Sequence, residues 1–248
     1  MFLHNHILKD TLVIIPTYNE IENIELMLRA IFSMYNEVHV LVVDDNSPDK
    51  TSQKVKQLQG EFPATLHLLL RPKKTGLGRA YIDGFKWAIE RSYQYIFEMD
   101  ADFSHNPKDL KILYQACLAP NIDLAVGSRY VKGINVVNWP FSRILLSYFA
   151  SFYVRFITGM PVKDPTSGFV CYNRSVLEAI DLDDIQFVGY AFQIEMKFKA
   201  LNKKFKIKEI PIIFTDRIRG ASKLTKGIIS EAVLGVIQMR TQQLLGRL

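Results

Sequence analysis

The sequence predicts an α/β fold in which a mostly parallel sheet is covered by helices on both faces. Short apolar runs rich in β-branched residues alternate with helical patterns through the first half of the chain, at residues 12–15, 38–43, 66–70, 95–99 and 123–126. This alternation is typical of buried parallel strands joined by helices. The 248 residues are 48% apolar and 23% charged, which suits a folded domain with a sizeable core.

The helices between these runs are predicted from periodicity and from capping residues. After the first run, apolar residues recur at helical spacing, at Ile21, Ile24, Leu28, Ile31 and Phe32. Ser47-Pro48 and Asn106-Pro107 each predict a helix start, because a capping side chain is followed by a proline suited to the first turn.

The second half of the chain has a different pattern. Residues 139–160 are rich in aromatic side chains with arginines among them and predict a helix, residues 207–214 predict a late strand, and residues 227–245 carry an apolar stripe. We therefore expect one domain over residues 1–226 and a C-terminal amphipathic helix over residues 227–248. Both helical segments can face either a core or a membrane interface.

Composition limits the classes of function. The formal charge of +6 suits phosphate-rich ligands, an anionic membrane surface or nucleic acid. The longest uncharged apolar stretch, residues 144–154, has only 11 residues, whereas a membrane span takes about 20. The two cysteines, Cys117 and Cys171, lie in apolar surroundings and predict buried free thiols.

Acidic side chains follow two of the predicted strands. Asp100-Ala101-Asp102 comes directly after residues 95–99, and two carboxylates one residue apart can bind the same Mg²⁺ or Mn²⁺. Such a metal would neutralise charge on a departing nucleotide diphosphate. A turn or cap role for Asp102 is the alternative. Asp44-Asp45 ends the second strand in the same way and predicts hydrogen bonds to a ribose or base, with a plain loop as the alternative.

Basic side chains supply candidate phosphate ligands. Arg129 ends the run after residue 123, and Arg217, Arg219 and Lys223 form a later cluster that is either a phosphate-binding loop or a solvated turn. The segment 73–80, with two lysines and two glycines, matches neither dinucleotide nor P-loop spacing, which disfavours a dehydrogenase. His105, just past the acidic triplet, is expected to lie at the surface or to form a hydrogen bond rather than to bind zinc. A nucleic-acid-binding module is disfavoured, because it would leave the strand-end carboxylates facing phosphates.

Taken in this order, the motifs resemble the family 2 glycosyltransferases, and specifically their dolichol-phosphate (polyprenol-phosphate) mannose synthase branch. The matching segments span nearly the whole chain: IPTYNEIENI (15–24), VVDDNSPDKT (42–51), GLGRAYIDGF (76–85), MDADFSHNP (99–107), GSRYVKG (127–133), DPTSGF (164–169), GYAFQIEM (189–196) and the run 217–223.

This resemblance implies a GT-A fold for residues 1–226 and a role for each matching position. The expected guanosine contacts are Pro16, Tyr18, Glu20, Val43 and Asp45. Asp100 and Asp102 would bind the metal, with Ala101 against the nucleotide. The expected contacts to the diphosphate or to the acceptor phosphate are Arg129, Arg217 and Lys223. Asp102 and Arg129 are the expected catalytic residues. Some relatives have a glutamine as third metal ligand where this chain has Ser104, so that ligand is expected to be the Ser104 hydroxyl or a water.

The implied reaction is metal-dependent transfer of mannose from GDP-mannose to a polyprenyl phosphate with inversion, with Mg²⁺ or Mn²⁺ as cofactor. Two alternatives stay open: a UDP-sugar:polyprenyl-phosphate glycosyltransferase, for example a glucosyl one, and a non-catalytic nucleotide-sugar-binding subunit. The expected partners are the donor, the lipid and a membrane surface, or a membrane-anchoring protein, with no nucleic acid. The expected location is peripheral, on the cytoplasmic face of a membrane.

Overall fold

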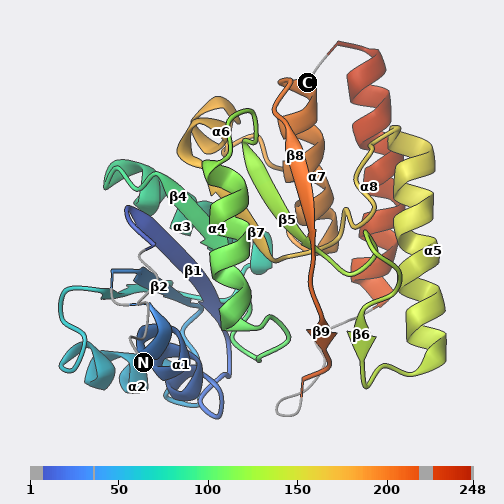
Figure 1. The fold of residues 1–248 in the computed structure, drawn as a ribbon. Coiled ribbons are helices and arrows are strands. Elements are labelled where there is room, and N and C mark those ends of the chain that lie inside the picture. Colours follow the sequence, from blue (N-terminus) through green and yellow to red (C-terminus); the bar gives the residue numbers. More distant parts are fainter. Residues whose placement is uncertain (1–7, 36, 218–225, 247–248) are drawn as a thin grey trace.

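The computed structural model describes residues 8–35, 37–217 and 226–246, and for residues 226–230 the backbone alone. Its centre is a seven-stranded sheet in the order β3-β2-β1-β4-β7-β5-β8 (Figure 1). The strands are β1 (Thr11–Thr17), β2 (His39–Asp44), β3 (Leu66–Leu70), β4 (Tyr95–Glu98), β5 (Leu124–Ser128), β7 (Val170–Asn173) and β8 (Ile207–Pro211). Only β7 runs antiparallel to its neighbours, β4 and β5, so the prediction of a mostly parallel sheet is confirmed.

Helices cover both faces of the sheet, as the alternation predicts. On one face α1 (Ile24–Met34), α2 (Thr51–Gln59) and α4 (Leu110–Leu118) share a core with Val13 and Ile15 of β1. On the other face α3 (Leu77–Glu90), α6 (Arg174–Ala179) and α7 (Tyr190–Asn202) pack on Leu12 and Ile14. Side chains of one strand alternate between the two cores, because successive residues of a strand point to opposite faces.

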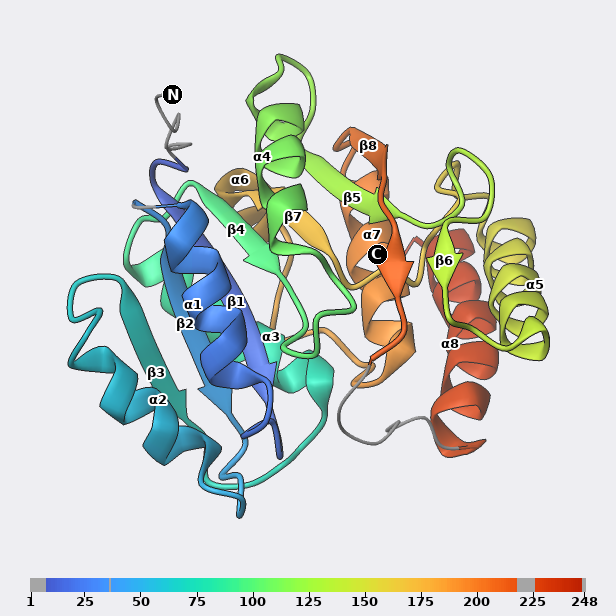
Figure 2. The ribbon, with the colours of Figure 1, turned by 60° about the horizontal axis from the view of Figure 1, so that its bottom comes forward.

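Two long helices form an additional layer outside α7. They are α5 (Phe141–Thr158) and α8 (Lys226–Leu244), and they lie side by side in both views (Figures 1 and 2). Val154 of α5 and Val236 and Met239 of α8 are buried with Ile194 and Phe198 of α7. None of the helices in the described ranges has the length and hydropathy of a membrane span.

Two details of the sequence interpretation are corrected. The helix start predicted at Ser47-Pro48 is wrong: α2 begins at Thr51, since the Ser47 amide and hydroxyl bond instead to Asp44. The strand predicted at residues 207–214 is broken in two. β8 ends at Pro211, and the chain continues as β9 (Phe214–Thr215), which pairs with β6 (Val136–Val137) in a separate sheet.

The start predicted at Asn106-Pro107 is confirmed. Pro107 opens a short 3₁₀ helix, η1 (Pro107–Asp109), and the Asn106 carboxamide oxygen accepts a bond from the Lys108 amide at 3.1 Å.

Contact between α3 and β1 depends on a glycine in the GLGRAYIDGF segment. A Cβ on Gly84 would lie 2.8 Å from Cγ2 of Ile14, a fully buried side chain of β1. We predict that Gly84→Ala lowers the free energy of unfolding by about 1–3 kcal/mol through overpacking, although alanine favours a helix interior by roughly 1 kcal/mol. Urea unfolding measures this change. The matched control is Gln57→Ala at an exposed site of α2, and a Gly84→Ala protein as stable as wild type would contradict the packing argument.

Candidate functional site

Three segments that the sequence singles out meet at one edge of the sheet. β2, β1 and β4 are adjacent and parallel, so the segments that follow them lie together at their carboxyl ends. The Asp45 amide donates to the Thr17 carbonyl at 3.0 Å, and the Met99 amide donates to the Ile14 carbonyl at 3.1 Å. The sheet therefore places Asp44-Asp45 and Asp100-Ala101-Asp102 on either side of the loop after β1.

Asp44 is a structural residue of this edge. It is fully buried, and its carboxylate accepts bonds from the Thr17 hydroxyl (2.8 Å), the Ser47 amide (2.9 Å) and the Ser47 hydroxyl (2.6 Å). These bonds tie the ends of β1 and β2 together and use the carboxylate inside the protein. Of the Asp44-Asp45 pair, only Asp45 therefore remains a candidate ligand-binding residue.

The loop after β1 is held by the segment between β2 and α2 and by the first residue of α2. The amides of Asn19, Glu20 and Ile21 donate to the side chains of Ser47, Thr51 and Asp49, each at 3.0 Å. This fixes the backbone of the loop that carries Tyr18 and Glu20. The Lys74 ammonium lies 4.3 Å from the centre of the Tyr18 ring, and Glu20 is largely buried, with the Asn23 amide group bonded to its carboxylate at 3.0 Å.

Asp45 is paired with an arginine that the sequence interpretation missed. Arg71 forms a largely buried ion pair with Asp45 and a second pair with Asp83 at 2.7 Å, and it also donates to the Thr75 hydroxyl. Burial raises the pKa of Asp45, and the Arg71 guanidinium opposes that shift. Arg71 directly follows β3, so its place at the same edge of a parallel sheet was the available signal.

Pro16 and Val43 lie opposite each other in the β1–β2 register. The Val43 side chain is fully buried in the core shared with α3, so a ligand could reach this residue only through its backbone.

The acidic triplet has one enclosed and one more open carboxylate. Asp102 is largely buried: one oxygen accepts from the Ser104 amide at 3.0 Å, and the other lies 3.3 Å from Nη2 of Arg217. The Asp100 side chain is 38% exposed. Desolvation, followed by repulsion from Asp102, raises the pKa of Asp100 to about 7, although Arg217 opposes the shift. Asp102 thus stabilises a turn through the Ser104 amide, which is the alternative role considered above, and it also lies beside the Arg217 guanidinium.

This donor set fits a hard divalent cation. It consists of carboxylate oxygens, and the raised pKa of Asp100 beside Asp102 shows that added positive charge would stabilise the ionised pair. Within the described ranges, no group of three or more His, Cys, Asp or Glu side chains is placed to hold a metal, so the protein could offer two carboxylates and leave other positions to diphosphate and water. Ala101, the expected nucleotide contact, and Ser104, the expected third metal ligand, are both buried.

His105 is a buried side chain that contacts the backbone of the acidic triplet. It is buried between aromatic rings, stacked on Phe169 with centroids 4.9 Å apart and edge-on to Phe214 at 5.5 Å. Its Nδ1 accepts a bond from the Asp100 amide at 3.2 Å, so the prediction of a hydrogen-bonding histidine is confirmed. Burial lowers the pKa of His105 to about 4, which keeps the ring neutral and able to accept that bond.

The Arg129 guanidinium is held by hydrogen bonds to Asp164 and Thr166. Nε and Nη2 donate to the two oxygens of Asp164 at 2.8 and 2.6 Å, the Arg129 amide adds a bond of 2.9 Å, and Nη2 also reaches the Thr166 hydroxyl. Both side chains are buried. Burial alone would raise the pKa of Asp164, but Arg129 holds it below its ordinary value of 3.8. Asp164 belongs to the DPTSGF segment, whose role as a clamp on Arg129 the sequence interpretation did not include.

Further aromatic and basic groups surround Arg129. Its guanidinium lies 5.6 Å from the centre of the Trp139 ring, and Arg143 lies 4.1 Å from the same ring. Arg143 also pairs with Asp216 at 2.8 Å, next to Arg217 in the chain. The structure thus brings Asp102 and Arg217 into contact and gathers two more arginines around Trp139. Arg219 and Lys223, the other members of the predicted basic loop, lie outside the described residues.

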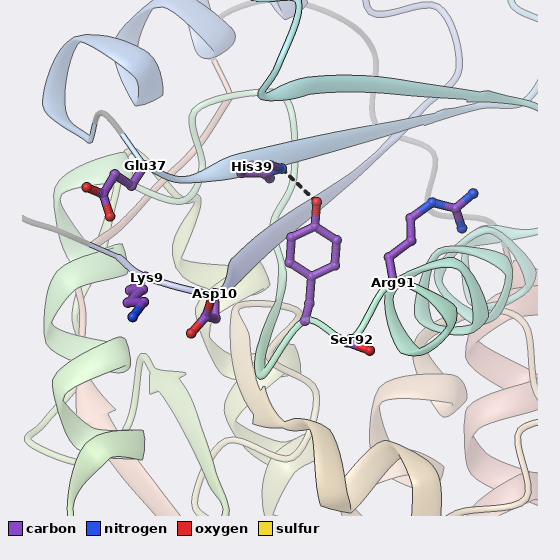
Figure 3. Close-up of a pocket in the computed structure, with 7 residues that line it drawn as sticks. Lys9, Asp10, Glu37, His39, Arg91 and Ser92 are labelled. Atoms are coloured by element: carbon purple, nitrogen blue, oxygen red, sulfur yellow. Dashed lines mark hydrogen bonds between the residues drawn. The ribbon is translucent and has the colours of Figure 1, made fainter.

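A separate pocket opens at the opposite edge of the sheet. It has a volume of about 390 Å³ and is lined by residues that precede β1, β2 and β4 or begin β2: Lys9, Asp10, Glu37, His39, Arg91, Ser92 and Tyr93 (Figure 3). The Tyr93 hydroxyl lies 2.6 Å from Nδ1 of His39. This pocket is at the amino ends of the strands and does not contain any of the predicted site residues.

Comparisons with known proteins match both the fold and the motifs. The family model described as "Glycosyl transferase family 2" matches residues 12–181. The chain is 46% identical over 228 residues to a polyprenol monophosphomannose synthase of Mycolicibacterium smegmatis, covering 92% of this chain and 86% of that protein. It is 45% identical over 225 residues to an undecaprenyl-phosphate mannosyltransferase of Micrococcus luteus, covering 91% of each.

A solved structure of similar fold is glucosyl-3-phosphoglycerate synthase from Mycobacterium tuberculosis, in complex with Mn²⁺, UDP-glucose and phosphoglyceric acid. It superposes with a TM-score of 0.70 at 15% identity, over 94% of this chain and 80% of that one. At this identity the likeness concerns the fold, which is GT-A-like as expected.

The Arg129–Asp164 pair generates a stability prediction. Asp164→Asn leaves a buried guanidinium without its counter-charge, so we predict a loss of about 3 kcal/mol in the free energy of unfolding at pH 7. Because the folded pKa of Asp164 is lowered, the carboxylate stabilises the protein above pH 3.8, and this contribution is lost as the pH falls through the folded value. The gap between wild type and variant should therefore stay constant near neutrality and narrow only in acid.

Urea unfolding across this pH range measures the gap. The control is Asp183→Asn, which breaks an exposed pair with Lys86 and should cost less than about 1 kcal/mol. Equal losses in the two variants would contradict a special role for the buried pair.

Proposed function

This chain belongs to glycosyl transferase family 2, and on that premise we propose that it transfers mannose from GDP-mannose to a polyprenyl phosphate. The observation that carries the proposal is the identity of 45–46%, over about nine tenths of the chain, to enzymes named as a polyprenol monophosphomannose synthase and an undecaprenyl-phosphate mannosyltransferase. The placement of Asp100, Asp102 and Arg217 at one edge of the sheet supports the same reaction.

On the donor side, the base and ribose would lie along the loop after β1. That loop is rigid because three successive amides are bonded to side chains of the Ser47–Thr51 segment. Arg71 holds the Asp45 carboxylate by a buried ion pair, which prevents it from rotating away from a ribose or base. Pro16, Tyr18, Glu20, Val43 and Asp45 remain the proposed guanosine contacts, Val43 through its backbone.

Asp100 and Asp102 would hold Mg²⁺ or Mn²⁺ together with the diphosphate, and Ala101 would lie against the nucleotide. When bound, the cation neutralises charge on the departing GDP. Because Ser104 is buried and its amide is bonded to Asp102, a water is the better candidate than the Ser104 hydroxyl for the third position. Arg217 pairs with the Asp102 carboxylate and would supply a second positive charge beside the leaving group.

On the acceptor side, the nucleophile would be a phosphate oxygen of the lipid. A phosphate is already anionic near neutral pH, so the protein needs little general-base help. Its task is to place that oxygen in line with the sugar C1 and to offset repulsion from the diphosphate. Arg129, Arg143, Arg217 and Lys223 are the proposed cations. The new C1–O bond forms as the C1–O bond to GDP breaks on the opposite face, which inverts the anomeric centre.

The lipid substrate suggests that α5 lies on a membrane surface. Phe141, Phe149, Phe152 and Phe156 are each more than half exposed, while Ser151, Val154 and Thr158 on the other side are buried. An apolar face of this size, with Arg143 and Arg155 on the same helix, suits the interfacial region of a bilayer. We propose peripheral attachment at the cytoplasmic face of a membrane, directly through this face or with the help of a membrane-anchoring protein.

The reaction is tested by incubating the protein with Mn²⁺, a polyprenyl phosphate and either GDP-mannose or UDP-glucose, and measuring release of the nucleotide diphosphate. We predict lipid-dependent release of GDP that falls at least about 100-fold in Asp102→Asn, because a preorganised charge at the leaving group is removed. Asp183→Asn, an exposed change, should match wild type. Turnover with UDP-glucose alone would overturn the donor assignment, and tight nucleotide binding without turnover would indicate a non-catalytic subunit.

Membrane attachment is tested by flotation with anionic liposomes. We predict that the triple variant Phe149→Ser, Phe152→Ser, Phe156→Ser loses binding by roughly 100-fold, since each exposed phenylalanine would contribute about 1 kcal/mol when partly inserted. The control is Leu26→Ser with Leu118→Ser, two similarly exposed apolar residues on α1 and α4. Wild type that stays at the bottom of the gradient, or a triple variant that floats equally well, would contradict direct attachment through α5.

A further inference from the structure

A fully buried lysine lies on the inner side of α7. Lys197 has no exposed surface, and its ammonium donates to the Ser167 carbonyl at 2.8 Å and to the backbone and side-chain oxygens of Gln193, each at 3.1 Å. These are three acceptors for three N–H donors, so the ammonium is satisfied without a solvent contact.

On one side of Lys197, the hydrogen bonds lead to the strand that carries the acidic triplet. The Gln193 amide group donates to Glu98, the last residue of β4 and two positions before Asp100. Glu98 is fully buried, and its other oxygen accepts from the Tyr172 hydroxyl at 3.1 Å. Gln193 therefore joins β4 to Lys197, with its amide nitrogen on one and its amide oxygen on the other.

On the other side, the bonds lead to the clamp on Arg129. Ser167, whose carbonyl accepts from Lys197, is bonded through its amide to the Asp164 carbonyl at 3.3 Å and through its hydroxyl to the Gly127 carbonyl at 2.6 Å. Residues 164–167 thus form one turn, held at Ser167 and presenting Asp164 to Arg129. A continuous buried path runs from Glu98 through Gln193, Lys197, Ser167 and Asp164 to the Arg129 guanidinium.

This arrangement is costly for stability alone. Desolvation lowers the pKa of Lys197 to about 8, while the carboxylates of Glu98 and Asp164 oppose that shift. Apolar residues of similar volume often stabilise a protein as well as or better than a buried ionic network does. A reason besides stability is therefore needed for placing a cation between the two halves of the site.

We propose that Lys197 and Gln193 are positioning residues that hold the Asp164–Arg129 clamp in register with the acidic triplet on β4. The inference rests on the proposed function for its kinetic consequence, because Arg129 is there a phosphate ligand. Lys197 acts through Ser167 and Asp164 and does not contact substrate. Its removal should let the 164–167 turn shift and displace the guanidinium from its place relative to Asp100 and Asp102.

The direct test needs no substrate. Lys197→Met keeps an unbranched side chain as far as Cε and removes the ammonium. Hydrogen–deuterium exchange should become faster in residues 127–131 and 164–169, where the Arg129 amide is bonded to Asp164, and stay unchanged in β1 and β2. The matched control is Phe198→Leu, a buried change on the next residue of α7 that faces α5 and α8. Unchanged exchange in both segments of Lys197→Met would overturn the proposal.

Kinetics then separate positioning from general destabilisation. For the lipid phosphate, kcat/KM should fall by about 10²-fold in Lys197→Met, which is the cost of displacing the Arg129 guanidinium by about 1 Å. The KM for the donor should stay as in wild type. In a double-mutant cycle with Arg129→Gln, the double variant should be no worse than Arg129→Gln alone, because Lys197 affects the reaction only through the position of Arg129. Additive losses would mean that Lys197 does not act through Arg129.

A double variant that restores the charge balance tests whether the loss of activity follows only from an unpaired buried charge. Lys197→Met with Glu98→Gln removes one buried charge of each sign and should recover stability against urea. Positioning requires that kcat/KM stays low in this pair, since the bond to Ser167 is still missing, and full recovery of activity would overturn it. Wild type that transfers no sugar from any donor would refute the proposed function, and the exchange experiment would still test the coupling.

Discussion

Carboxylates crowded at the carboxyl edge of three adjacent parallel strands create a repulsion that much of the surrounding structure compensates. Hydrogen bonds from Thr17 and Ser47 stabilise the Asp44 carboxylate, Arg71 pairs with Asp45, and Arg217 lies beside Asp102. The charge of Asp100 is compensated least, and the raised pKa of its carboxyl group reflects this. Among the described residues, Asp100 is thus the carboxylate suited to a ligand that brings a cation with it. The sheet order β2-β1-β4 makes this crowding unavoidable.

Local sequence patterns predicted the five strands of the first half and the strand end that carries the acidic triplet, but they did not predict β7, α6 or α7. Alternating apolar runs predicted the sheet and its two helical faces, and the placement of Asp100 and Asp102 followed from the end of β4. The pairing of Arg129 with Asp164, 35 residues away, depends on contacts that no local pattern contains. The same holds for Arg71 with Asp45 and for Lys197 between β4 and the 164–167 turn. Family resemblance marked several of these segments as important without saying what each does.

The corrected details have a common physical cause. Ser47-Pro48 has the composition of a helix start, but a buried Asp44 three residues earlier offers the Ser47 amide and hydroxyl a better partner. Residues 207–214 have the composition of one strand, but the chain leaves the main sheet after Pro211 to pair with β6. In both cases a tertiary contact outweighs a local preference.

The antiparallel direction of β7 also bears on the order in which the molecule can fold. Since β7 runs against β4 and β5, the segment that precedes it, and not the one that follows, reaches the ligand edge, which brings Asp164 to Arg129 and Phe169 to His105. β4 and β5 share no ladder in this sheet and are joined only through β7. During synthesis the acidic half and the basic half would therefore remain separate until residues 170–173 are available. A chain stopped before that point would carry Asp100, Asp102 and Arg129 and still lack the strand that joins them.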